Sequence, residues 1–298
     1  MNYLILAILA SVAVSVFLKL ARTYHIQTEQ AIFVNYSVAA SATYFFLTPD
    51  ITALTSLNLQ SPALPIILAL GVLLPSIFIV MAHAVRHAGI IKTDAAQRLA
   101  LFIPILAALT IFGEALTLQK KIGLGLAFTA LFCLITKSSS SKSRGASNAG
   151  AVALCLIAVW LGFGIIDVLF KQTAKMGSAF PATLLAAFVL SGAVMLVYLL
   201  AKRTAWHATS LASGIILGAL NFANILCYVR AHQAMKDTPT TVFAGMNVGV
   251  IALGAIVGAV VFRERISRLN MLGIVLAISA IGCLLYLDKL ASMLGFTL

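Results

Sequence analysis

Charged side chains are scarce in this chain. Only 9% of its 298 residues are Asp, Glu, Lys or Arg, whereas 62% are hydrophobic, and the mean hydropathy is +1.08. Soluble domains carry about 25% charged residues, so the polar surface available here is too small to cover one. The composition therefore excludes the soluble globular class and predicts a protein embedded in a membrane.

Acidic residues are scarcer still, and cysteines are few. There are 8 Asp and Glu against 20 Lys and Arg, which gives a formal net charge of +12. The basic residues stand at the ends of apolar segments, which predicts contact with lipid headgroups and not with nucleic acid. The four cysteines lie inside apolar segments without C-x-x-C spacing, so they predict neither a zinc site nor a disulfide framework. No metal and no cofactor is expected.

The short motifs of enzymes are also missing from the sequence. It contains no nucleophile elbow, no phosphate-binding glycine loop and no H-E-x-x-H metal motif. We therefore expect no enzymatic activity.

Long apolar runs dominate what is present. They form ten segments of about 17–25 residues, the length that carries a helix across roughly 30 Å of hydrocarbon. A serine-rich basic stretch, residues 137–148, lies between the fifth and sixth segments and predicts a flexible linker. The predicted spans are 3–21, 30–48, 62–85, 90–113, 119–136, 150–171, 179–200, 209–230, 239–262 and 268–287.

The sequences on either side of this linker resemble each other. Because each half holds five predicted helices, an odd number, the second copy must enter the membrane from the opposite side. We therefore predict an all-α membrane protein whose ten transmembrane helices form two inverted five-helix repeats, residues 1–136 and 149–298. Such repeats can open a shared midplane site to each side in turn. The paired residues at a shift of 150 are Phe112 and Phe262, Glu114 and Glu264, Gly123 and Gly273, and Cys133 and Cys283, and residues 16–19 match 168–171 at a shift of 152.

One motif surrounds the end of the fourth predicted helix. Pro104 is followed by Phe112-Gly113-Glu114-Ala115-Leu116-Thr117 and then by Gly123. This pattern resembles the repeat of EamA-type members of the drug/metabolite transporter superfamily, and the resemblance covers essentially the whole chain. The second copy departs from the pattern, with Arg263 in place of Gly and Gly254 in place of Pro. The resemblance implies ten helices and transport, with export favoured, and it leaves the cargo open.

Ionisable side chains at membrane depth cost about 2.5–3.5 kcal/mol each on insertion scales, so those present need a reason. Arg98 is the clearest example of an ionisable residue at membrane depth. Gln97 stands beside it, and Asp94 stands one turn before it. Arg98 either pairs with Asp94 and reaches a headgroup or binds an anionic group of the cargo. Gln97 has a polar repeat partner, Asn247.

Amides and one tyrosine are further candidates for cargo binding. Asn221, Asn224 and Tyr228 recur at i, i+3 and i+7, which places them on one face of the eighth segment. Asn35 lies in the second segment. Each of these side chains either joins helices or binds cargo.

Asp167 and Lys171 form an i, i+4 pair in the sixth segment, and Lys19 is the repeat partner of Lys171. These lysines either reach headgroups or support the cargo site. A carboxylate one turn inside hydrocarbon must be paired or protonated, so Asp167 is the candidate for coupling transport to a proton. Glu114 and Glu264 stand at helix ends near basic residues and are expected to form structural ion pairs or caps.

These observations predict a transporter, and more narrowly an exporter, of a small polar metabolite such as an amino acid, working by alternating access. Two alternatives remain: a nucleotide-sugar or phosphate-compound exchanger, and a non-transporting membrane scaffold. The expected partners are a small-molecule substrate and the lipid bilayer, without nucleic acid, and a homodimer is left open. We expect a multi-pass protein of the bacterial inner (plasma) membrane, with the orientation of its termini undecided.

Overall fold

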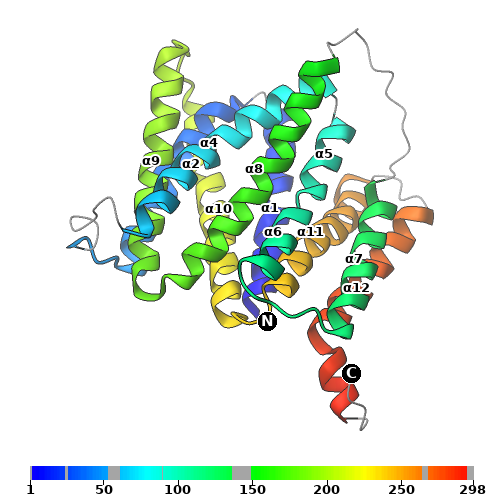
Figure 1. Ribbon diagram of the computed structural model, residues 1–298. Coiled ribbons are helices and arrows are strands. Elements are labelled where there is room, and N and C mark those ends of the chain that lie inside the picture. Colours follow the sequence, from blue (N-terminus) through cyan, green and yellow to red (C-terminus); the bar gives the residue numbers. More distant parts are fainter. Residues whose placement is uncertain are drawn as a thin grey trace. The chain divides into compact units, whose positions relative to one another are not determined.

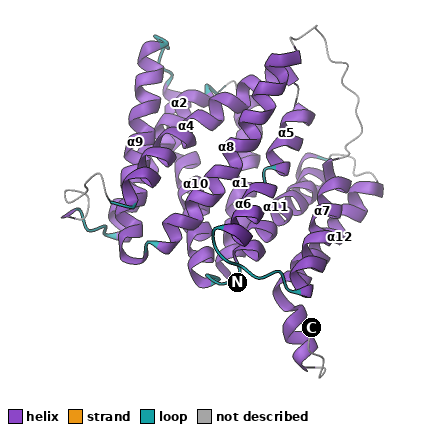
Figure 2. Ribbon diagram, viewed as in Figure 1, coloured by secondary structure: helices purple, strands orange, loops and turns teal. Residues whose placement is uncertain are grey.

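The chain is helical in a computed structural model that describes residues 2–23, 26–52, 61–88, 90–135, 149–263 and 268–293. These described ranges contain no strand (Figure 2). The helices are α1 (Asn2–Thr23), α2 (Thr28–Leu47), α4 (Ala63–Ala88), α5 (Ile90–Leu99), α6 (Phe102–Thr110), α7 (Leu118–Ile135), α8 (Ala149–Lys175), α9 (Phe180–Ala201), α10 (Ala208–Ala234), α11 (Pro239–Phe262) and α12 (Arg268–Met293), with a 3-10 turn at Gly177–Ala179.

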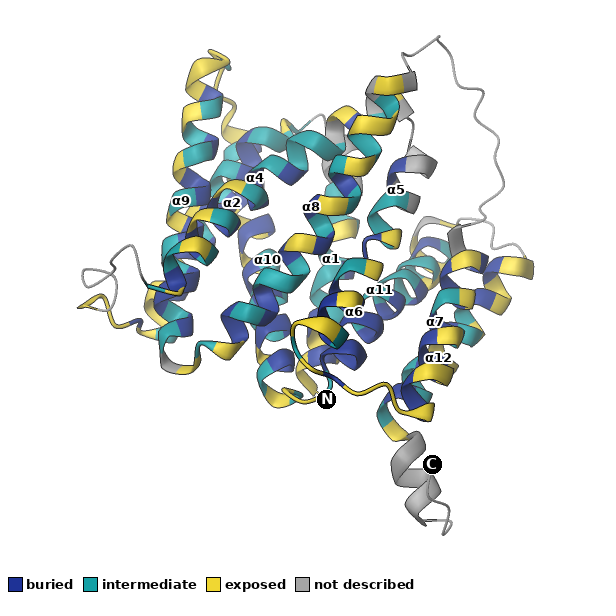
Figure 3. Ribbon diagram, viewed as in Figure 1, coloured by how far each residue is buried: buried dark blue, intermediate teal, exposed yellow. Residues whose placement is uncertain are grey.

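Six of these helices are long and apolar enough to cross a membrane, namely α4, α8, α9, α10, α11 and α12. Two shorter apolar stretches, Asn2–Leu18 and Ala96–Thr110, lie in α1 and in α5 with α6. Single helices carry buried residues on one face and exposed residues on the other (Figure 3), and many of the exposed ones are large and apolar. Apolar surface of this kind is stable in lipid. The chain is therefore a multi-pass helical membrane protein.

The helix starts follow the predicted apolar segments closely, whereas α8, α10 and α12 extend four to six residues beyond the predicted ends. The predicted segment 90–113 is not one helix, because α5 ends at Leu99 and α6 begins at Phe102. Pro104 explains the break, since it has no N–H to donate to the carbonyl of Ala100. The N–H of Ile103 donates to that carbonyl instead, at 3.0 Å.

This exchange deprives the carbonyl of Leu99 of its usual helical donor, the N–H of Ile103. Trp160 of α8 replaces it, because its indole N–H donates to the Leu99 carbonyl at 3.0 Å. One turn further along α8, the backbone at Gly164 approaches Ile103 closely. Contacts with α8 therefore stabilise the break in the fourth predicted segment.

The helices, labelled in Figure 1, pack into two compact units. Unit 1 comprises residues 1–79 and 168–234, and unit 2 comprises residues 80–167 and 235–298. Each unit thus takes helices from both halves of the sequence. The repeat boundaries at residues 136 and 149 were drawn from sequence similarity and not from packing, so they stay a prediction. The predicted linker, residues 137–148, lies outside the described residues.

In unit 1, α2 packs against both α9 and α10. Glu29 at the start of α2 meets Lys202 just after α9, whereas Tyr36, further along α2, lies against Phe188, earlier in α9. The two helices therefore run antiparallel. The backbone of α10 approaches α2 at Gly214 and Gly218, where an added Cβ would stand 2.6 Å from side chains of α2.

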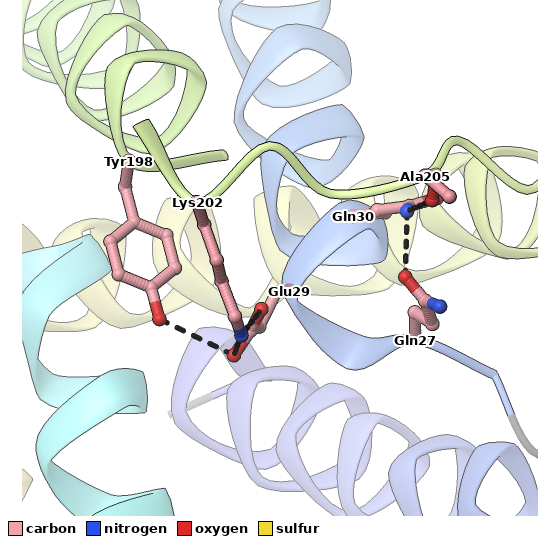
Figure 4. A network of polar contacts seen from close by, with 6 residues as sticks. All are labelled: Gln27, Glu29, Gln30, Tyr198, Lys202 and Ala205. Atoms are coloured by element: carbon pink, nitrogen blue, oxygen red, sulfur yellow. Dashed lines mark hydrogen bonds and ion pairs between the residues drawn. The ribbon is translucent and has the colours of Figure 1, made fainter. Parts of the chain in front are cut away.

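A network of polar contacts joins the ends of α2 and α9 (Figure 4). The Lys202 ammonium donates to both carboxylate oxygens of Glu29, at 2.8 and 2.6 Å, and the Tyr198 hydroxyl donates to Glu29 at 3.4 Å. Gln30 donates its amide to the carbonyl of Ala205 at 2.6 Å. The hydrogen bond to Glu29 raises the pKa of Lys202.

In unit 2, α7 packs against α12, where Gly123 leaves room for Leu284. Glu114 lies before α7 and is buried. One of its oxygens is 2.9 Å from the Lys120 ammonium, and the other accepts the N–H of Thr240 at 2.8 Å. That N–H belongs to the first turn of α11, where donors lack helical acceptors. The predicted structural role of Glu114 as ion pair and cap is confirmed, and Glu264 lies outside the described residues.

Candidate functional site

A polar face of α10 forms the centre of the candidate site in unit 1. Asn221 and Asn224 are partly exposed, and Tyr228 is buried. The same face continues to His232, at i+11 from Asn221, which is 0% exposed. The ring centroids of Tyr228 and His232 lie 4.8 Å apart in an edge-on arrangement. We name these four residues the α10 polar face.

Lys171 of α8 lies against the end of this face. Its side chain is 1% exposed, and its ammonium donates to the carbonyl of His232 at 3.5 Å. The preceding residue, Phe170, contacts the Tyr228 ring edge-on at 6.2 Å. Lys171 is therefore buried and does not extend to a headgroup as a lysine at a helix end often does.

The chemistry of this cluster is that of polar recognition. An ammonium, an imidazole and a phenol together offer hydrogen-bond donors, and the imidazole also offers an acceptor. A buried cation needs polar partners in an apolar slab, and the His232 carbonyl is one of those of Lys171. The cluster suits an anionic or zwitterionic group, whose carboxylate or phosphate oxygens would accept from Lys171.

Asn35 of α2 is a second buried polar group in unit 1. It is 1% exposed, and among the described residues no hydrogen-bond partner reaches its amide nitrogen or its amide oxygen. The oxygen of the Asn224 amide is likewise buried without a partner in the described part of the chain. An unmet buried amide costs about 1–3 kcal/mol, so both amides are available to a ligand or a bound water.

The break between α5 and α6 positions the candidates of unit 2. Gln97 and Arg98 lie in the last turn of α5 and are partly exposed. Discontinuous helices of this kind place ends of helices at the substrate sites of many transporters. The side chain of Asp94, the predicted partner of Arg98, lies outside the described residues.

The remaining predicted residues have simpler surroundings. The Asn247 amide of α11 donates to the carbonyl of Phe243 in its own helix at 3.1 Å. Asp167 is partly exposed one turn before Lys171 on α8. Lys19 falls in α1, but its side chain lies outside the described residues.

The structure thus brings some candidates together and not others. Tyr228 and Lys171 both contact His232 in unit 1. Asn35 lies in the same unit. Gln97, Arg98, Asn247 and Asp167 belong to unit 2. His232 is the residue that the sequence analysis missed, although its spacing from Tyr228, i+4, is a helical signal. Within the described ranges, no cluster of three or more His, Cys, Asp or Glu side chains could hold a metal ion.

Comparison with known proteins identifies a relative by sequence and a solved structure with a similar fold. No protein-family model matches the chain. A crystal structure of a protein with 13% sequence identity aligns with a TM-score of 0.70, covering 97% of this chain and 96% of the other. At this identity the likeness concerns the fold alone. An uncharacterized protein of Haemophilus influenzae is 57% identical over 292 residues, which are 97% of this chain and 99% of the relative. The chain therefore belongs to the same protein family as that Haemophilus influenzae protein.

Proposed function

We propose that the chain is a membrane transporter of a small polar metabolite, such as an amino acid, and that it works by alternating access between two inverted five-helix repeats. The EamA-type resemblance, the export direction and a place in a bacterial inner membrane belong to this proposal. A relative from a bacterium supports the last of these.

The observation that carries the proposal is a contact that occurs twice in unit 1. Val38 of α2 packs at Gly218 of α10, and Leu190 of α9 packs at Gly71 of α4. Leu190 follows Val38 by 152 residues, the same shift at which residues 16–19 match 168–171. The two glycines lie in the third predicted segment of each half but 147 residues apart, so the match is between pairs of helices and not between single glycine positions. Repeat-related helices would form such matching pairs.

The directions of the helices support the same proposal. In an inverted repeat, equivalent helices cross the membrane in opposite directions. The second helices of the two halves, α2 and α9, run antiparallel, because Glu29 meets Lys202 whereas Tyr36 meets Phe188. The buried α10 polar face and Lys171 then supply groups that could bind a polar cargo.

A second candidate function is exchange of a nucleotide sugar or another phosphate compound. The buried ammonium of Lys171 favours it, because phosphate oxygens bind cations strongly. An exchanger differs from an exporter in one measurable respect, since its outward flux increases when counter-substrate is present on the other side.

Flux measurements in sealed liposomes test the proposal. The purified chain is reconstituted and challenged with a panel of amino acids, sugars and phosphate compounds, each with and without a pH gradient. We expect saturable flux of at least one polar compound, and a response to the pH gradient that Asp167→Asn removes. Absence of flux for every compound, with correctly folded protein in the vesicles, would leave a non-transporting scaffold as the better account.

A further inference from the structure

A groove on unit 1 lies apart from the α10 polar face. It runs between α2 and α9, has a volume of about 230 Å³, and is lined by Phe33, Tyr36, Phe188, Gly192, Ala193 and Leu196, among others. Tyr36, Phe188 and Gly192 form a buried floor, whereas Ala193 on the rim is exposed. We name it the α2–α9 groove.

The composition of the groove indicates what can fill it. Its lining contains no charged side chain. On α9 the lining residue Val189 is exposed, as are Val197 and Leu200 outside the lining. Pockets for drug-sized molecules are larger, about 300–1,000 Å³, and hold several converging polar groups. In a membrane protein such a surface faces lipid, so a single hydrocarbon chain fits the groove better than a folded molecule.

Basic and aromatic residues lie beyond one end of the groove. Trp206 is exposed, and its ring lies 6.1 Å from Phe33 in an edge-on arrangement. Lys202 and Arg203 lie between Leu196 and Trp206 in the sequence, and both are exposed. Tryptophan and basic side chains together are typical of the headgroup level of a bilayer. The groove is therefore a hydrocarbon-sized slot with a cationic edge at Arg203, next to the Glu29–Lys202 ion pair.

We propose that the α2–α9 groove binds one acyl chain of an anionic phospholipid, whose phosphate lies at Arg203, beside the Glu29–Lys202 ion pair. The occupant follows from the combination of an uncharged groove with a cationic edge at one end. A zwitterionic lipid could fill the slot equally well, but it would gain less at Arg203, because Glu29 already neutralises Lys202. Each basic residue near the surface is worth about a fivefold preference for an anionic lipid. This proposal does not depend on the proposed transport function.

Quenching of Trp206 by brominated lipid tests the proposal. Trp160→Phe leaves Trp206 as the single tryptophan, and the protein is placed in bilayers that carry a small fraction of phosphatidylglycerol or phosphatidylcholine with brominated acyl chains. We expect brominated phosphatidylglycerol to quench at about one-fifth of the mole fraction that phosphatidylcholine needs, or less. Arg203→Gln, which leaves the Glu29–Lys202 pair in place, should remove most of this preference.

Two matched variants locate the acyl chain. Ala193→Phe fills the groove and should abolish preferential quenching, whereas Val197→Phe, one turn along α9 and outside the lining, should leave it unchanged. If Trp160→Phe fails to fold, native mass spectrometry of the chain with both tryptophans can instead count the phosphatidylglycerol molecules that stay bound. Equal quenching by the two lipids, unaffected by Ala193→Phe, would overturn the proposal. So would dissociation of a dimer by Ala193→Phe, because a second copy would then occupy the groove.

Discussion

Lys171 and Lys175 lie one turn apart on α8, yet Lys171 is buried and Lys175 is exposed. The pair therefore offers a matched comparison at the scale of single residues. If Lys171 binds the cargo, Lys171→Gln removes a charge-assisted hydrogen bond worth about 1.5–3 kcal/mol. We expect flux at subsaturating substrate to fall by about tenfold or more in liposomes, with little change for Lys175→Gln. Equal effects of the two substitutions would contradict a cargo-binding role for Lys171.

The Glu29–Lys202 ion pair makes a prediction about pH. Glu29 raises the pKa of Lys202, so the stabilising contribution is complete below the unfolded lysine value of about 10.4 and disappears as the pH rises through the higher folded value. Because the Lys202 side chain is 49% exposed, we expect Glu29→Gln to cost about 0.2–1 kcal/mol between pH 7 and 9. Thermal unfolding in detergent should show this difference closing as the pH rises beyond the unfolded lysine value. If the stability difference between the protein and Glu29→Gln persists at high pH, it arises from packing and not from the ion pair.

The sequence located part of the candidate site and missed part of it. The i, i+3, i+7 spacing of Asn221, Asn224 and Tyr228 correctly indicated one face, because helical periodicity is local. His232 escaped because the charge of Arg230 placed the end of the predicted segment there, whereas α10 continues to Ala234. The burial of Lys171 could not be predicted either, since it depends on α10, a helix distant in sequence.

At the scale of elements, the break between α5 and α6 depends on Pro104. In Pro104→Ala, the new N–H can donate to the Ala100 carbonyl, and Ile103 can return to the Leu99 carbonyl in competition with Trp160. We expect a continuous helix, unchanged or higher stability by up to about 3 kcal/mol, and reduced flux because Gln97 changes orientation.

The fluorescence of Trp160 reports on this change when Trp206 is replaced by Phe. Its emission should shift in Pro104→Ala because the Ile103 N–H then competes with the indole for the Leu99 carbonyl. Pro75→Ala is the control, since α4 continues through Pro75 without a break. An unchanged Trp160 spectrum in Pro104→Ala, with flux retained, would contradict a functional role for the break.

Close helix contacts at glycines give a second prediction at this scale. An alanine Cβ at Gly218 would stand 2.6 Å from the Val38 Cβ and 3.0 Å from the backbone oxygen of Asn35, and one at Gly71 would stand 2.8 Å from the Leu190 Cβ. We expect each substitution to destabilise the protein by about 1–3 kcal/mol. Gly125→Ala meets no atom within 4 Å and should be neutral or stabilising by up to about 1 kcal/mol. Comparing the thermal midpoints of the three variants checks the ranking.

Helix boundaries were the most predictable feature of the fold. Apolar runs ended by charges and turn residues gave α7 and α11 to within one residue, because burial in hydrocarbon demands continuous apolar sequence. Breaks were less predictable. Pro75 and Pro104 both lie inside apolar runs, yet only the helix at Pro104 is interrupted within the described residues. The difference depends on neighbours such as Trp160, which the local sequence does not reveal.

At the scale of the whole molecule, the inverted repeat stays a prediction that rests on sequence pairs and on contacts within unit 1. The matching contacts of Val38 with Gly218 and of Leu190 with Gly71 favour it. The fold shared with a crystal structure at 13% identity shows that the architecture tolerates extensive change in sequence. Under the proposed function, the choice of cargo depends on the few buried polar side chains and not on that architecture.

The most direct test of this account is the side of the membrane on which the linker lies. Cysteines are placed at Ser141 and beyond each terminus of a chain whose four native cysteines are replaced by alanine, and an impermeant thiol reagent is applied to intact and to inverted vesicles. Two inverted repeats of five spans each predict that Ser141 is labelled from one side and both termini from the other. Labelling of the linker and the termini from the same side would contradict the account.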